Sequence, residues 1–194
     1  MSVTSMSTGA TGISLALENN YMEPIATTLV GAGGTNSIIF NDIPQTYKNL
    51  QIRLMSRNNR ASTADTLGIQ FNGDTSISNY VWQHYIYANN GSAGAAGYGT
   101  GVNASIYLGD CPSASATANI FSISVTDILD YGSTSKNKTL RSLNGKEAGT
   151  SAQGFVSFSS GAWLSTTPIS SIKIFCNNGN FVQYSRFSLY GIKV

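Results

Sequence analysis

The sequence predicts an all-β fold: a single antiparallel β-sandwich of jelly-roll type that follows an extended N-terminal arm. Apolar and polar residues alternate in five short runs, as they do in strands with one face in a core and one in water. The chain has four Asn-Gly pairs, and this pair accepts the positive φ angles of tight hairpin turns. No segment carries the 3.6-residue periodicity of a helix of about ten residues or more.

The first segment, residues 1–20, differs from the remainder of the chain. It is rich in Ser, Thr, Gly and Ala, and its only charge is Glu18. Ile13, Leu15 and Leu17 alternate at strand spacing. We predict that this arm leaves its own sandwich, residues 21–194, and packs on a neighbouring chain by adding to a sheet edge. The alternative is a chain terminus without fixed structure.

The alternating runs predict the strands of the sandwich, roughly eight to ten in all. In each run we expect the apolar residues to face the core and the polar residues to face water. The third run includes Phe121, Ile123 and Val125, which alternate with serines and a threonine. The five runs are residues 50–55, 66–71, 121–126, 172–174 and 187–189.

The connections are predicted from turn residues. Two long loops are expected: residues 89–103, composed mostly of Gly, Ala, Ser and Asn, and residues 130–138. A loop as long as the first is typical of a functional or mobile segment. The predicted turns are the pairs Asn72-Gly73, Asn90-Gly91, Asn144-Gly145 and Asn178-Gly179.

Composition excludes several functional classes. The 194 residues include 11 Lys and Arg against 9 Asp and Glu, so the net charge is only +2. This field is too weak to indicate nucleic acid or an acidic membrane as the main partner. The first residues lack the features of a signal peptide, and no apolar stretch has the roughly 18 residues of a membrane helix.

The candidate chemical groups predict neither an enzyme nor a cofactor or metal site. The single histidine, His84, has no nucleophile motif beside it, so a structural role on an aromatic strand is favoured. The pairs Asp127 with Asp130 and Asp74 with Asp110 could in principle serve a glycosidase. Capping and turn roles are commoner for such residues, and the acids are too scattered for a calcium loop.

The two cysteines, Cys111 and Cys176, lie far apart in the sequence. We expect two buried thiols that act as small apolar side chains. A disulfide between them stays open as an alternative.

A basic segment is the candidate for an interface. Lys48, Arg53, Arg57 and Arg60 follow one another with no acidic residue among them. Arginine is enriched at protein interfaces, and we therefore expect Arg57 and Arg60, in the loop after a strand, to meet carboxylates or carbonyls of another subunit. The alternative is a solvated loop whose charges contribute only solubility.

Several sequence blocks together resemble a family. They are Tyr-Met-Glu-Pro-Ile-Ala-Thr-Thr at 21–28, Ile-Pro-Gln-Thr-Tyr-Lys-Asn-Leu-Gln-Ile-Arg at 43–53, Phe-Asn-Gly-Asp at 71–74, Asn-Tyr at 79–80, Ala-Ser-Ala-Thr-Ala-Asn-Ile-Phe at 114–121, Asp-Ile-Leu-Asp-Tyr at 127–131, Lys-Thr-Leu-Arg-Ser-Leu-Asn-Gly at 138–145 and Leu-Tyr-Gly-Ile-Lys at 189–193. The chain from Tyr21 to Val194 resembles small virion proteins of tailed bacteriophages, especially those that infect cyanobacteria and other aquatic hosts.

The resemblance implies a structural protein of the virion, assembled in the host cytoplasm. The favoured role is a capsid cement or decoration protein that binds the major capsid protein and stabilises the head shell. A homo-oligomer is expected, and a trimer is favoured because shells offer local threefold positions. The alternative is a tail fibre or baseplate component in which Trp82, Trp163 and the ten tyrosines help to bind a glycan or receptor.

Overall fold

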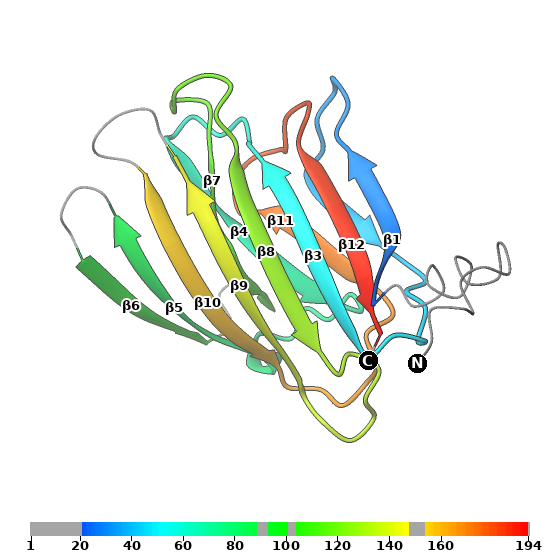
Figure 1. Cartoon of the computed structure of the whole chain (residues 1–194). Helices are drawn as coiled ribbons and strands as arrows, with labels where there is room; N and C mark the ends of the chain where they lie inside the picture. The colour runs from blue at the N-terminus through cyan, green and yellow to red at the C-terminus, as the bar shows by residue number, and fades with distance from the viewer. Residues whose placement is uncertain (1–20, 89–92, 101–103, 148–153, 194) are drawn as a thin grey trace, which may run out of the picture.

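The structure, a computed structural model, describes residues 21–88, 93–100, 104–147 and 154–193. These residues form two antiparallel sheets that pack face to face (Figure 1). The predicted fold class, an all-β sandwich, is confirmed. Within the described residues the helical structure is limited to 3-10 turns such as Ile77–Asn79, and no helix there is long and apolar enough to cross a membrane.

The described strands number twelve, more than the eight to ten expected. The larger sheet has the strand order β1-β12-β3-β8-β9-β10-β5-β6, and the smaller sheet has the order β2-β11-β4-β7. The strands are β1 Met22–Leu29, β2 Ser37–Phe40, β3 Asn49–Ser56, β4 Ala64–Phe71, β5 Tyr80–Ala88, β6 Ala93–Thr100, β7 Ile106–Pro112, β8 Ser122–Leu129, β9 Lys138–Lys146, β10 Phe155–Trp163, β11 Ile172–Cys176 and β12 Arg186–Ile192.

The apolar core lies between the two sheets and extends from β12 and β3 to Ile128, Leu140 and Trp163 on β8, β9 and β10. The apolar members of four predicted runs face inward and are almost fully buried, as expected. Each such side chain contributes about 1.5–3 kcal/mol by leaving water. They are Leu50, Ile52, Leu54, Leu67, Ile69, Phe71, Ile172, Ile174, Phe187 and Leu189.

The third predicted run, residues 121–126, has the opposite orientation to the one expected. In β8 the side chains of Ser122, Ser124 and Thr126 are buried, whereas Ile123 and Val125 are exposed. Pairing with β3 fixes this register, because Ile52 faces Thr126 and Leu54 faces Ser124 on the inner side. A shift of one residue would exchange the two faces of the strand.

Two predicted connections are corrected and two are confirmed. Asn144-Gly145 lies inside β9 instead of forming a turn, and residues 93–100, expected within a loop, form β6. Asn72 and Gly73 follow β4 with positive φ angles of 51° and 66°, as a tight turn requires. Residues 130–137 form the expected second loop. Asn90-Gly91 lies outside the described residues, and Asn178-Gly179 lies in a bend after β11.

The two cysteines are free, buried thiols, as favoured from the sequence. Their Sγ atoms lie 3.7 Å apart, on two strands that flank β4. Two strand spacings separate the backbones by about 9.6 Å, which exceeds the reach of a disulfide. The arm, residues 1–20, lies outside the described residues, so its packing on a neighbour stays a prediction.

Candidate functional site

Eight large apolar side chains gather on the outer face of the larger sheet. Their exposed fractions range from 39% for Met55 to 61% for Ile123. The set, named here the outer apolar face, consists of Met55, Tyr85, Tyr87, Ile123, Val125, Leu143, Val156 and Phe158.

Strand pairing arranges this face as two adjacent rows that cross β3, β8, β9, β10 and β5. The first row runs Met55, Ile123, Gly145, Val156, Tyr87, and the second runs Arg53, Val125, Leu143, Phe158, Tyr85. Directly paired residues on one face of a sheet touch one another. The rows therefore make one continuous patch that is about 20 Å wide across five strands.

Charged side chains border the patch. Arg53 lies in the second row, Arg186 pairs with Met55 at the end of the first row, and Arg141 lies next along β9. The guanidinium of Arg141 donates to the carboxylate of Asp127 at 3.2 Å. The rim thus carries three cations and one anion around an apolar centre, which is the usual anatomy of a protein interface.

Beneath this patch, the inner side of β8 and β9 is polar. Thr126 Oγ1 donates to Ser142 Oγ at 2.9 Å, and Ser142 Oγ donates to the carbonyl of Leu108 at 3.0 Å. Asn144 Nδ2 donates to Ser124 Oγ at 2.7 Å. Because buried polar groups must be hydrogen-bonded to be tolerated, these strands can direct hydroxyls inward and keep their apolar side chains outside.

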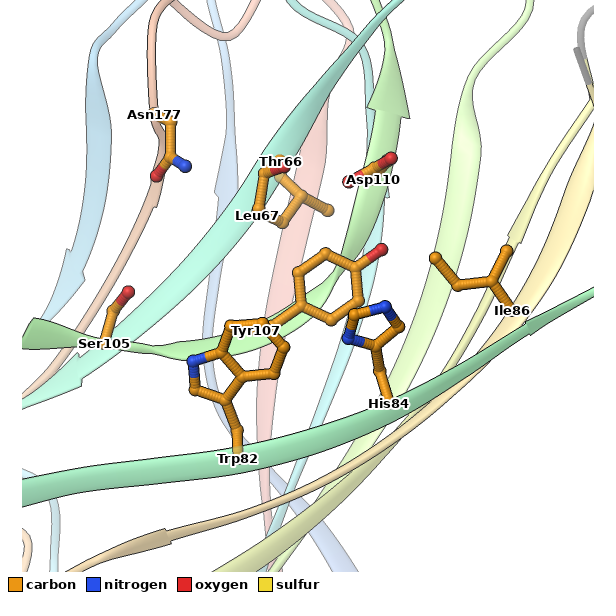
Figure 2. Close-up of a pocket in the computed structure, with 9 residues that line it drawn as sticks. All are labelled: Thr66, Leu67, Trp82, His84, Ile86, Ser105, Tyr107, Asp110 and Asn177. Carbon is orange, nitrogen blue, oxygen red and sulfur yellow. The ribbon is translucent and has the colours of Figure 1, made fainter. Parts of the chain in front are cut away.

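A cavity of about 370 Å³ lies between β5 and the smaller sheet at this polar end (Figure 2). Trp82, His84 and Ile86 reach it from alternate positions of β5. Tyr107 and Asp110 reach it from β7. The remaining lining residues are Thr66, Leu67, Ser105 and Asn177.

A β-bulge explains how Tyr107 and Asp110 come to share the cavity. Residues three apart on a regular strand point to opposite faces. In β7, however, Gly109 pairs with Leu67 and Tyr107 pairs with Gly68, so one extra residue interrupts the ladder. Gly109 has φ +129°, and a Cβ there would lie 2.3 Å from the Asn144 side chain. The position therefore requires glycine.

Three aromatic rings form one wall of the cavity. The centroid of Tyr107 lies 5.5 Å from that of Trp82 and 4.7 Å from that of His84, and the Trp82 and His84 centroids are 5.2 Å apart. Burial lowers the pKa of His84 below its usual value of about 6.5, which favours the neutral imidazole at pH 7. His84 thus lies on the aromatic strand β5, as favoured from the sequence, and its ring also lines the cavity.

Polar atoms without hydrogen-bond partners cluster at this end of the sandwich. Six buried side-chain atoms in the described residues lack a partner. Five of them are His84 Nδ1, Tyr107 Oη, Asp110 Oδ1, Ser157 Oγ and Ser159 Oγ, on β5, β7 and β10. Burial, and then the charge of Asp110, raises the pKa of Tyr107, and Ser157 lies near the same hydroxyl. No hydrogen bond of normal geometry joins these three side chains.

The Arg57 side chain contacts its own chain, whereas the sequence predicted contacts with another subunit. Its side chain is 9% exposed, and its guanidinium donates to four carbonyl oxygens of its own chain. The distances lie between 2.8 and 3.0 Å. The expectation that Arg57 meets another subunit is wrong, because these bonds occupy its donors in holding the loop between β7 and β8. The accepting carbonyls belong to Ser113, Ala116, Thr117 and Ile120.

The other cations of the basic segment have partners within the chain as well. Arg60 lies 3.2 Å from the buried carboxylate of Asp65, and Lys48 lies 2.6 Å from Asp130. An acid five residues along the chain, Asp65, and one distant in sequence, Asp130, therefore supply the balancing charge that was expected from another subunit. The Arg60 side chain is 42% exposed, so its participation in an interface stays a prediction, as does that of Ile13, Leu15 and Leu17.

The carboxylates considered for catalysis lie in separate settings. Asp130 binds Lys48 and Lys136, and the hydrogen bond from Lys136 is the main reason that its pKa falls to about 2. Asp74 accepts hydrogen bonds from Trp163 and Asn79 at 2.7 and 2.8 Å. Among the described residues no group of three or more His, Cys, Asp or Glu side chains could hold a metal ion.

Comparison with known proteins adds little to this geometry. No protein-family model matches the sequence, and no curated protein matches it significantly. Among solved structures, the chain is similar to the galectin LEC-6 of Caenorhabditis elegans, with 7% sequence identity and a TM-score of 0.33 over 87% of this chain and 96% of that one. A likeness of this degree says nothing about what this chain binds.

Proposed function

We propose that this chain is a structural subunit that is held in a larger assembly by its outer apolar face. The assembly is a tailed-phage virion, in which the chain acts as a cement or decoration protein on the head shell. The observation that carries the structural role is the continuous patch of eight exposed apolar side chains. The virion enters only through the resemblance of the sequence blocks.

The physical support is the cost of leaving such a patch in water. Burying apolar surface contributes about 25 cal/mol per Å², and monomeric proteins rarely expose apolar patches larger than a few hundred Å². The rim arginines Arg53, Arg141 and Arg186 favour a partner with an apolar centre and carboxylates around it. Such a partner would supply both affinity and orientation.

The oligomeric state and the position in the virion are also part of the proposal. β1 and β6 are the terminal strands of the larger sheet, and a terminal strand offers its free edge to a neighbouring chain. A homo-oligomer, with a trimer favoured, is consistent with these edges. A tail fibre or baseplate position is the alternative, and copy number separates the two: hundreds of chains per particle indicate the head, whereas a few dozen or less indicate the tail.

The test is a charge substitution within the patch. In the double variant Leu143→Lys and Phe158→Lys, both side chains are already exposed, so the fold should be retained. We expect the variant to be lost from purified particles, with occupancy reduced at least tenfold in a quantitative gel. The matched control is Ile39→Lys, because Ile39 is 53% exposed on the smaller sheet. Wild-type occupancy of the double variant would contradict the proposal.

A further inference from the structure

The cavity between β5 and β7 is distinct from the outer apolar face, since the two lie on opposite sides of β5. Trp82, His84 and Ile86 point inward from this strand, whereas Tyr85 and Tyr87 point outward. We infer that the cavity binds one or two units of an uncharged saccharide. The inference does not depend on the proposed structural role.

The size and lining of the cavity fit a small ligand. Sites for small molecules have volumes of roughly 300–1,000 Å³ and combine apolar walls with a few directed polar groups. The volume here, about 370 Å³, is at the lower end of that range. It suits one or two sugar rings rather than an extended chain.

The aromatic wall supplies an apolar platform. Trp82 and Tyr107 lie beside each other with their ring planes inclined by only 30°. In Figure 2 the Tyr107 ring lies in the middle of the lining residues, beside the rings of Trp82 and His84. The CH groups on one face of a pyranose ring can pack on such a surface, which an amphipathic aromatic side chain provides at little entropic cost.

The unpartnered polar atoms supply directed hydrogen bonds. Tyr107 is only 7% exposed, and its hydroxyl lacks a partner, as do His84 Nδ1 and Asp110 Oδ1. A buried polar atom without a partner costs about 1–3 kcal/mol. A ligand with several hydroxyl groups can donate to His84 and Asp110 and can accept from Tyr107 at the same time.

The charges around the cavity favour a neutral ligand. Asp110 lies close enough to Asp65 and Lys146 for both to affect its titration. An anion would be repelled by the carboxylates of Asp65 and Asp110, and a cation would compete with Lys146 for Asp110. Burial keeps His84 uncharged at pH 7, so no further cation is available to hold an anion. Uncharged hydroxyl groups are neither repelled by the carboxylates nor in competition with Lys146.

The two tryptophans of the chain provide a site-specific readout. Trp82 lines the cavity, whereas Trp163 is buried elsewhere with its Nε1 bound to Asp74. In ¹H–¹⁵N NMR spectra of the full chain, we expect saturable shifts of the Trp82 indole resonance, and none of the Trp163 resonance. The probes are the methyl glycosides of glucose, galactose, mannose and N-acetylglucosamine, each up to about 50 mM, a range that covers millimolar affinity.

A matched pair of variants tests the geometry. Tyr107→Phe removes only the buried hydroxyl, and we expect at least tenfold weaker binding. Tyr85→Phe removes a hydroxyl from the outer side of β5 and should leave binding unchanged. A methyl glycoside mimics the terminal unit of a polysaccharide, whereas a free sugar does not. Comparing the affinities of the two therefore distinguishes the end of a polysaccharide from a free sugar as the ligand.

Two results would overturn the inference. One is the absence of any Trp82 shift with all four glycosides. The other is binding that Tyr107→Phe does not weaken. Neither result bears on the outer apolar face, whose variants are tested separately by particle occupancy.

Discussion

The two halves of the larger sheet have opposite polarity. In the β12–β3 half, apolar side chains such as Ile52 and Leu189 are fully buried, and Arg53 and Ser188 lie on the outer side. Where β8, β9 and β10 carry the outer apolar face, side chains such as Ser124 and Ser142 face inward, and apolar residues such as Leu143 face outward. Toward the other end of these strands, Ile128, Leu140 and Trp163 belong to the apolar core. The first half supplies the fold with a core. The second half, held together by polar contacts inside, leaves an apolar surface available to a partner.

The boundary between the halves is the pairing of β3 with β8. Ile52 and Thr126 are direct neighbours across it, and both are fully buried. An alternating pattern therefore identifies which residues share a face of a strand, but not which face is buried.

Arg57, at the end of β3, fastens the loop that leads into β8. Arg57→Ala should destabilise the protein by about 3–5 kcal/mol, because it removes several charge-assisted hydrogen bonds and leaves buried carbonyls without donors. Arg60→Ala, the matched control, should cost about 0–1 kcal/mol, since its ion pair is partly exposed. Urea unfolding of both variants measures the difference, and equal effects would show that Arg57 does not hold the loop.

Ile52 and Thr126 test the contrast at the boundary itself. Ile52→Ala should cost about 2–5 kcal/mol through lost burial and the cavity that remains. Thr126→Ala should cost only about 1 kcal/mol, because one hydrogen bond is lost and Ser142 keeps its bond to the Leu108 carbonyl. Thermal unfolding distinguishes the two variants. A larger loss of stability for Thr126→Ala would mean that the buried polar contacts of β8 and β9, and not the apolar side chains, contribute most to the stability of the fold.

Asp110 tests the polar interior. Burial, with a smaller effect of Asp65, raises its pKa, so the folded chain holds this proton to a higher pH than the unfolded chain does. Ionisation therefore costs stability as the pH rises above the unfolded value of about 3.9. Asp110→Asn should stabilise the fold by about 1 kcal/mol at pH 7 and by nothing near pH 3. A pH-independent difference would contradict this account.

The sequence alone predicts the β-sandwich and the inward orientation of the apolar residues in the β12–β3 part of the larger sheet. The apolar residues of strands such as 50–54 and 67–71 face inward, as the alternation predicts, because they pack with one another in the apolar core between the sheets. Residues 121–126 were oriented wrongly, since the inward hydroxyls are stabilised by residues distant in sequence, such as Ser142. The serines and threonine that alternate there, together with Ser157 and Ser159, were the available signal.

The candidate site was less predictable. The cavity depends on the bulge at Gly109, which no local pattern indicates. The buried position of Arg57 depends on carbonyls about 60 residues later in the chain, supplied by residues such as Thr117 and Ser113. Composition showed only that the segment was basic. A long-range contact of this kind decides whether an arginine serves the fold or an interface.

The most direct test of the central claim is an electron cryomicroscopy map of the assembled particle that contains this chain. The account predicts that a neighbouring protein covers β8, β9 and β10, with its atoms within about 4 Å of Leu143 and Phe158 and with carboxylates near the rim arginines. A map in which these side chains face solvent, while the subunit is attached through another surface, would contradict the account.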